Sequence, residues 1–512
     1  MADFQNYMVV FLVSLIFPII FRAFRRRSHR LPPGPIPFPI IGHLHHLGPK
    51  LHKSLQKLSH RYGPLVQLFL GSNPCLVVAS PELAKEFLQT HDVTFSNHPE
   101  RVFGQIISYG YADLAFAPYG PRWRFMRKVC MTSVLSTHSL LQIEPIRREE
   151  RNLFLQALLE KAKAGEAVHV KDEILKLTNN VASRMTMNQR CTEHESEAAR
   201  VKNCMTEITQ IAAKLNVADY LWFLKNLDVQ GHRKRTAAAH HKFDMMMERV
   251  LKEHEEERRR KEAGEGGGEL KDLVHTLLDI MEDENAEMRL TRDNVKAILL
   301  NVFGGATESP ANAMVWAVAE LINSPNLLEK ARHEIESIIG KDRLVEESDI
   351  PNLPYIQAIV RETLRLHPGF TVISRRSTQD CIVAGYHIPA NTELLVNVWA
   401  MARDPNYWEN PLEFSPSRFL NEDGSIKKEL DVKGRQFLLL PFGSGRRICP
   451  GASHTLQLVP STIAAVIQCF DWKVGDGGNG SINMEEGHGS SRAHPLVCVP
   501  VARFNPFLTH AG

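Results

Sequence analysis

The stretch that most restricts what this chain can fold into is residues 441–451, with the sequence PFGSGRRICPG. It fits the pattern Phe-x-x-Gly-x-Arg-x-Cys-x-Gly at every fixed position. A cysteine thiolate pushes electron density onto iron and favours O–O cleavage, and it needs nearby donors to be stable. We therefore interpret Cys449 as the axial ligand of a haem iron, with Phe442 covering the sulfur and Arg447 pairing with a propionate. The alternative is a buried structural cysteine beside a glycine-rich turn.

This segment resembles the cysteine loop of cytochrome P450 enzymes, and the resemblance extends over essentially the whole chain. It implies the cytochrome P450 fold, mainly α with a small β region, preceded here by one N-terminal transmembrane helix. It also implies haem b as the cofactor, with iron ligated by the thiolate of Cys449. The resemblance assigns cofactor contacts to Trp123, Arg127, Arg375, Phe442, Arg447 and Gly451.

Composition sets broad limits on domain number and partners. The chain has 512 residues, and about 150 residues per domain would suggest three domains. We expect one catalytic unit instead, because the resemblance runs through the whole chain. The net charge of +3 gives no signal for nucleic acid. Eight cysteines without a C-x-x-C pair do not form a disulfide pattern, which favours a reducing compartment.

The start of the chain predicts a membrane anchor. Residues 4–21 carry no charge, and a cluster of arginines follows at positions 22–30. A helix of this length spans about 27 Å, enough for a thin bilayer, and the basic residues keep the carboxyl side in the cytosol. A cleaved signal peptide would carry its charges before the apolar run. We expect an anchor at 1–24, a basic and proline-rich hinge at 25–40, and a catalytic domain at 41–512 on the cytosolic face of the endoplasmic reticulum.

Residues 293–322 have the apolar periodicity of one long helix, but the centre breaks the rules for a helix interior. Two glycines and Pro310 lie there, and inside a helix glycine costs about 1 and proline about 3 kcal/mol. We expect a kink, either purely structural or functional. The family has an acid–alcohol pair here that delivers protons during oxygen activation, which implies that role for Glu308 and Ser309. Serine replaces the usual threonine and is less restrained at χ1.

Three further patterns support the same interpretation. Residues 60–80 alternate between apolar and polar around 65–68 and 76–78, which predicts short strands of a small sheet. Glu362 and Arg365 share one face of a predicted helix, and with Arg418 they resemble the family's buried charged network behind the cysteine loop. We expect residues 369–374 to line the pocket above the haem. The histidines at 43, 45 and 46 lack metal-ligand spacing and are expected at the surface.

Stretches at 119–128, 345–350 and 441–451 resemble one plant family of P450 enzymes. That family contains flavone synthase II, isoflavone synthase, dihydroxypterocarpan 6a-hydroxylase and β-amyrin 24-hydroxylase. The resemblance implies a monooxygenase that uses O2 and electrons from NADPH–cytochrome P450 reductase. Its substrate would be small and apolar or phenolic, with flavonoids, isoflavonoids and pterocarpans as the leading class. Pro310 resembles the triterpenoid member and keeps a β-amyrin-type substrate open.

Two rival functions also bind haem. One is a haem-thiolate isomerase or dehydratase that needs no reductase, and the other is a haem-binding protein without catalysis. The reductase interpretation predicts a positive field beside the cysteine loop, since such a field attracts an acidic partner. The cations that would supply this field are Arg122, Arg124, Lys128, Lys433, Arg435 and Arg446.

Overall fold

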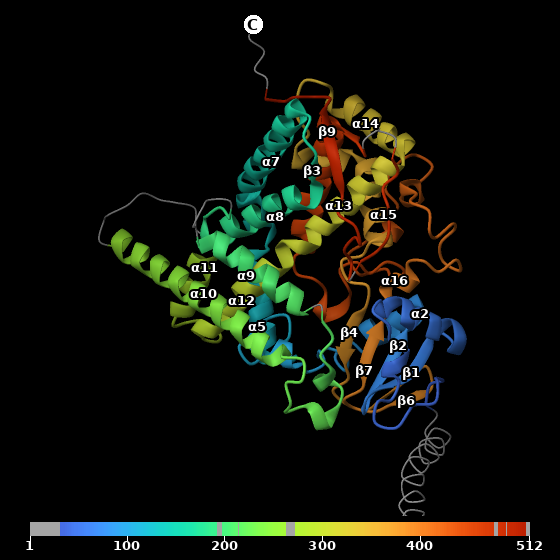
Figure 1. Cartoon of the computed structure of the whole chain (residues 1–512). Coiled ribbons are helices and arrows are strands. Elements are labelled where there is room, and N and C mark those ends of the chain that lie inside the picture. The colour runs from blue at the N-terminus through green and yellow to red at the C-terminus, as the bar shows by residue number, and fades with distance from the viewer. Residues whose placement is uncertain are drawn as a thin grey trace, which may run out of the picture.

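The computed structural model of the chain describes residues 31–191, 197–212, 214–262, 272–475, 480–487 and 489–507. Within these residues, helices form most of the body and the strands form three small sheets (Figure 1). The prediction of a mainly α fold with a small β region is confirmed. The anchor predicted at residues 1–24 lies outside the described residues. None of the helices in the described part is long and apolar enough to cross a bilayer.

The helices include long ones that pack in the core and short ones that connect other elements. Those of the first half are α2 (Leu51–Tyr62), α3 (Pro81–Lys85), α4 (Val102–Ile107), α5 (Pro121–Val129), α6 (Thr137–Gln142), α7 (Glu144–Ala164), α8 (Val170–Met187), α9 (Glu197–Ala212) and α10 (His232–Glu262). Those of the second half are α11 (Leu273–Glu282), α12 (Arg292–Ala306), α13 (Glu308–Asn323), α14 (Pro325–Ile339), α15 (Pro354–Leu366), α16 (Val398–Met401) and α17 (Ala452–Cys469). Several begin with proline, whose missing N–H would have no partner at that position anyway.

The largest sheet lies at one end of the body beside α2, at the lower right of Figure 1. Its strands in spatial order are β1 (Leu65–Leu70), β2 (Asn73–Val78), β7 (Glu393–Val396) and β4 (Ile373–Arg376). β2 and β7 run parallel, and the other two pairs are antiparallel. The strands predicted near 65–68 and 76–78 are confirmed. Because β4 is an edge strand of this sheet, the sheet fixes the backbone of Arg375.

Two smaller sheets lie elsewhere in the chain. One joins β3 (Val168–His169), β9 (Val497–Ala502) and β8 (Phe470–Lys473), and the other is the hairpin of β5 (Cys381–Val383) and β6 (Tyr386–Ile388). The main apolar core surrounds α17, which packs against α7, α13, α14 and α15. Since residues 441–451 lead directly into α17, this packing determines where the cysteine loop lies.

The described part of the proline-rich hinge is docked on the large sheet. The carbonyl of Pro33 accepts a hydrogen bond of 2.7 Å from the N–H of Gln67 in β1. His43 is fully buried; its Nδ1 accepts from the N–H of Phe69 at 2.7 Å, and its Nε2 lies 3.1 Å from the carbonyl oxygen of Pro35. The prediction that His43 is a surface residue is therefore wrong, because its ring is buried in contact with backbone groups of Phe69 and Pro35.

Candidate active site

Cys449 lies where its loop turns into α17. The loop is closed by a hydrogen bond of 2.9 Å from the N–H of Cys449 to the carbonyl of Phe442. The surrounding protein partly removes the Cys449 thiol from water and so raises its pKa, although the residue keeps exposed surface. The N–H groups of Gly451 and Ala452 and the guanidinium of Arg127 act in the opposite direction. The positive end of a helix also favours a thiolate. The side chain of Cys449 is exposed, whereas every other cysteine is buried or half-buried, so this thiol is the one available as a ligand.

The loop requires glycine at one position of the pattern and not at the other. Gly445 has φ +68°, and a Cβ there would lie 2.4 Å from the carbonyl oxygen of Leu88 and 2.6 Å from a carboxylate oxygen of Asp92. Gly451 has φ −84°, and its Cβ would lie 4.0 Å from the sulfur of Cys449, an ordinary contact. The backbone therefore explains the glycine at 445, and the structure gives no steric reason for the one at 451.

Three guanidinium groups gather beside the thiol, from α5, β4 and the cysteine loop. Arg375 donates to the carbonyl of Ser374 at 2.9 Å, and Arg447 donates to the carbonyl of Ser96 at 2.7 Å. Burial lowers the pKa of Arg375 to about 10. Burial, together with the nearby charges of Arg375 and Arg127, lowers the pKa of Arg447 to about 9. Within the described chain, none of the three arginines has a carboxylate at ion-pair distance.

This arrangement fits haem b. A cluster of buried positive charges is costly unless anions offset it. The two propionates of haem would supply those anions, and the exposed thiol of Cys449 would supply the axial ligand. The predicted residues Arg127, Arg375, Arg447 and Cys449 are thus brought to one place by segments that lie far apart in the sequence.

Trp123 lies in this group in a different role from the one expected. Its indole N–H donates to the carbonyl of Leu114 at 3.0 Å. Its ring lies 4.5 Å from the guanidinium of Arg447, a cation–π contact. In this structure Trp123 therefore orients Arg447, and its direct contact with a propionate stays a prediction. Phe442 is half-buried and packs on the core around α17, and its covering of the sulfur stays a prediction.

The long helix predicted over 293–322 is interrupted, as its glycines and proline indicate. α12 ends at Ala306 and α13 begins at Glu308, while Thr307 between them has φ −105° and ψ −72°. The hydroxyl of Thr307 donates to the carbonyl of Phe303 at 2.9 Å. The kink is therefore confirmed, and Thr307 stabilises it by bonding a carbonyl at the end of α12.

The two predicted proton-transfer residues lie at the start of α13. A carboxylate oxygen of Glu308 lies 3.4 Å from Nζ of Lys171, which belongs to α8, and both side chains are about one-third exposed. Ser309 faces Gly369, since a Cβ on Gly369 would lie 3.9 Å from the Cβ of Ser309. The helix break thus lies against the 369–374 segment, which was predicted to line the pocket.

The charged network predicted behind the cysteine loop is confirmed. Arg365 donates to Glu362 through Nε at 2.7 Å and Nη2 at 2.8 Å, and Arg418 donates to the same carboxylate at 2.9 Å. Glu362 and Arg365 are both fully buried. The N–H of Ser415 adds a fourth bond at 2.8 Å to Glu362. This network ties α15 to the segment at 413–419.

The sequence matches the cytochrome P450 family model over residues 32–497. This chain belongs to the cytochrome P450 family. This P450 is similar to 3,9-dihydroxypterocarpan 6A-monooxygenase of Glycine max, with 47% identity over 508 residues, or 98% of this chain and 99% of that protein. It is also similar to beta-amyrin 24-hydroxylase of Glycine max, with 44% identity over 513 residues, or 99% of this chain and 100% of that protein.

A solved structure supports the same fold. A zebra fish cytochrome P450 determined with abiraterone has a TM-score of 0.72 at 24% identity, covering 88% of this P450 and 99% of that chain. Haem b is therefore the cofactor of this P450, in agreement with the charge and thiol arrangement described above.

Sequence patterns missed two residues of the site. Burial, together with Arg375 and Arg447, holds the pKa of His98 well below its usual range, so a neutral imidazole lies beside the two arginines. Lys171 pairs with Glu308 across two helices. A lone histidine in a loop and a lysine in an ordinary helix carry no spacing signal, so only the tertiary contacts reveal them.

The predicted docking cations divide into two groups. Arg122, Arg124, Lys433 and Arg435 are exposed. Lys128 pairs with Glu287 at 3.0 Å, and Arg446 pairs with Asp92 at 3.1 Å, so part of their charge is neutralised locally.

Proposed function

We propose that this P450 is a membrane-anchored monooxygenase that oxidises a small plant metabolite with O2 and electrons from an NADPH-dependent reductase. The observation that carries the proposal is the exposed thiol of Cys449 near three arginines that have no carboxylate at ion-pair distance in the described chain. Arg375 is buried, and Arg127 and Arg447 are half-buried. When bound, haem supplies the thiolate-ligated iron that activates dioxygen. The protein's own residues hold that group and control protons and water around it.

The α12–α13 break supports proton delivery. Glu308 is partly exposed and can exchange protons with solvent, while Ser309 supplies a hydroxyl on the side of the 369–374 segment. A relay must keep its members within about 2.6–3.2 Å or one water of each other. Lys171 would fix the orientation of the Glu308 carboxylate through their 3.4 Å contact.

For the substrate we propose a flavonoid, isoflavonoid or pterocarpan. The support is the 47% identity to a protein named as a pterocarpan monooxygenase. A pentacyclic triterpenoid is the second candidate, because the beta-amyrin 24-hydroxylase is 44% identical over the full chain. Pro310 in α13 favours that second candidate.

We propose that residues 1–24 anchor the protein in the endoplasmic reticulum, with the hinge at 25–40 and the catalytic domain at 41–512 facing the cytosol. Large apolar side chains that are exposed on the hinge and on the 215–229 segment support a membrane surface there. They include Ile36, Phe38, Ile40, Trp222, Phe223 and Leu227, with Ile36 at 72% and Trp222 at 73% exposure. Both segments touch the β1–β2 hairpin, because the N–H of Gln67 in β1 donates to Pro33 and the side chain of Asn73 in β2 donates to the carbonyl of Asp219. Protease added to intact microsomes should digest the catalytic domain, and full protection would contradict this orientation.

The reductase would dock on the cationic surface beside the cysteine loop. We expect Arg124→Glu and Lys433→Glu to slow electron transfer at low ionic strength and to matter less at high salt, where the Debye length shrinks to a few ångströms. Lys252→Glu on α10 is the matched control and should leave the rate unchanged. If neither salt nor the substitutions Arg124→Glu and Lys433→Glu change the reduction rate, the reductase docks on another surface.

The function is tested with microsomes that contain this P450 and a reductase, supplied with flavonoid, pterocarpan and triterpenoid substrates. We expect NADPH-dependent product from one class and the Soret band of a thiolate haem in the reduced carbon monoxide complex. Cys449→Ala should abolish both. Product formed without NADPH would favour the isomerase or dehydratase, and an unchanged Soret band in Cys449→Ala would overturn the ligand assignment.

A further inference from the structure

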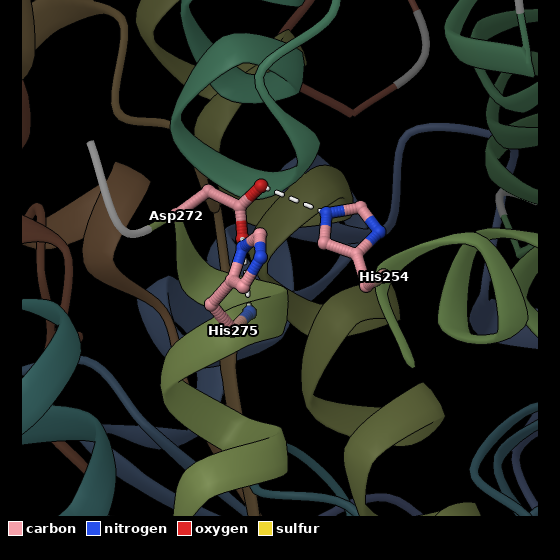
Figure 2. A group of neighbouring side chains, drawn as sticks. All are labelled: His254, Asp272 and His275. Carbon is pink, nitrogen blue, oxygen red and sulfur yellow. Dashed lines mark hydrogen bonds and ion pairs between the residues drawn. The ribbon is translucent and has the colours of Figure 1, made fainter. Parts of the chain in front are cut away.

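A second group of metal-binding side chains lies outside the haem site, where α10 approaches the start of α11 (Figure 2). His254 comes from α10, and Asp272 and His275 come from the first turn of α11. His254 Nε2 lies 2.9 Å from one carboxylate oxygen of Asp272, and His275 Nδ1 lies 2.9 Å from the other. One ligand atom from each residue lies within 4.8 Å of the other two.

The surrounding hydrogen bonds orient all three residues toward one point. His254 Nδ1 donates to the carbonyl of Val250 at 2.8 Å, which directs Nε2 toward Asp272. Asp272 caps α11 and accepts the backbone N–H of His275 at 2.9 Å, so its carboxylate cannot turn away freely. The remaining nitrogen of His275, Nε2, is buried without a hydrogen-bond partner, and a carboxylate oxygen of Glu257 lies 3.9 Å from it.

Metal-bound histidines usually donate their other ring N–H to a carbonyl or a carboxylate. Val250 already accepts such a bond from His254, and Glu257 is close to accepting one from His275. Coordination of a metal through Nδ1 of His275 would place the ring proton on Nε2. That buried nitrogen could then donate a hydrogen bond to Glu257.

Two imidazoles and one carboxylate suit a transition metal better than Ca²⁺ or Mg²⁺, which prefer oxygen ligands throughout. Ligands about 2.05 Å from a tetrahedral ion lie about 3.3 Å apart. Here each histidine contacts a different oxygen of Asp272 at 2.9 Å, and one ligand atom from each residue lies within 4.8 Å of the other two, so small side-chain rotations would bring three ligand atoms around one ion. We propose that His254, Asp272 and His275 bind one Zn²⁺, which links α10 to α11 and leaves the fourth position to water. The ion takes the place of the proton on His254 Nε2, so acid weakens binding.

The zinc site would stabilise the fold and would take no part in substrate oxidation. α11 packs against α8 and α12, and α12 leads to the helix break at Thr307. Zinc bound between α10 and α11 therefore stabilises the helices that support that side of the protein, without contact with the haem residues.

The test uses the full-length holoprotein without a histidine tag, freed of metal with a chelator. The chain has 23 histidines, so adventitious binding must be separated from this site. We expect one Zn²⁺ per chain that withstands gel filtration, and a thermal midpoint that rises with zinc. Asp272→Asn and His275→Gln should each weaken zinc binding at least tenfold and remove that rise. His333→Gln, which changes an exposed histidine on α14, should leave binding unchanged.

X-ray absorption at the zinc edge of the unmodified protein keeps the proposal testable if a variant fails to fold. We expect only nitrogen and oxygen neighbours at about 2.0–2.2 Å, with the scattering of two imidazoles. Sulfur in that shell, no stoichiometric zinc, or equal binding by Asp272→Asn and the unmodified protein would show that the three residues are only a hydrogen-bonded link. The carbon monoxide spectrum, which reports the haem site, should not change with zinc, so the two proposals fail separately.

Discussion

Replacing Glu362 by glutamine exchanges one carboxylate oxygen for an NH2 group at the centre of the buried network behind the cysteine loop. The carboxylate receives both donors of Arg365, one donor of Arg418 and the N–H of Ser415. Glutamine has almost the same shape, and its oxygen can still accept from Arg418 and Ser415. Its NH2 group, however, must face Nε of Arg365, so that hydrogen bond is lost and the negative charge is removed.

The size of the stability loss in Glu362→Gln follows from the burial of its partner, Arg365. Arg365 is fully buried and keeps only neutral acceptors, the carbonyls of Ala402, Pro411 and Glu413. Removing one partner of a buried ion pair costs about 3–5 kcal/mol. Domains have about 5–15 kcal/mol of total stability, so Glu362→Gln should lose a large share of it. Because every 1.4 kcal/mol is about a tenfold change, the unfolded fraction should rise at least about a hundredfold.

The assay is a urea titration of the purified holoprotein, followed by the Soret band of the reduced carbon monoxide complex. Glu362→Gln should lose the band at clearly lower urea than the unmodified protein. Glu413→Gln is the matched control, since that side chain is exposed and only its carbonyl joins the network, and it should change stability by no more than about 0.5 kcal/mol. If Glu362→Gln and the control unfold at the same urea concentration, the buried charge of Arg365 does not need Glu362, and the reasoning is refuted.

Three other changes test the site. Gly445→Ala should prevent haem incorporation, because its Cβ would overlap a backbone carbonyl, whereas Gly451→Ala should retain haem; the haem content of both purified variants checks this. Lys171→Met should release the carboxylate of Glu308 and lower the product formed per NADPH, with the haem spectrum unchanged; equal coupling in Lys171→Met and the unmodified protein would remove Lys171 from the proton path. Ser309→Ala should lower the ratio of product to NADPH and raise peroxide release; an unchanged ratio would leave an ordered water or the substrate's own hydroxyl as the relay.

The sequence alone determined the parts of this protein whose chemistry is local. The cysteine loop could be recognised because its glycine, arginine and cysteine serve one short turn at the start of one helix. The break at Thr307 followed from glycines and a proline inside a periodic helix, and the spacing of Glu362 and Arg365 followed from one helical turn. These features depend on neighbours within about ten residues, so the linear pattern carries them.

Only the tertiary structure decided which distant side chains meet. Trp123 packs on Arg447 and gives its N–H to Leu114, because α5 crosses the cysteine loop at that point. His43 is buried because the hinge docks on β1, and no local pattern records that contact. The Lys171–Glu308 pair and the His254–Asp272–His275 group likewise join separate helices. Contacts between elements depend on how the helices pack, and a single sequence does not show which distant residues that packing brings together.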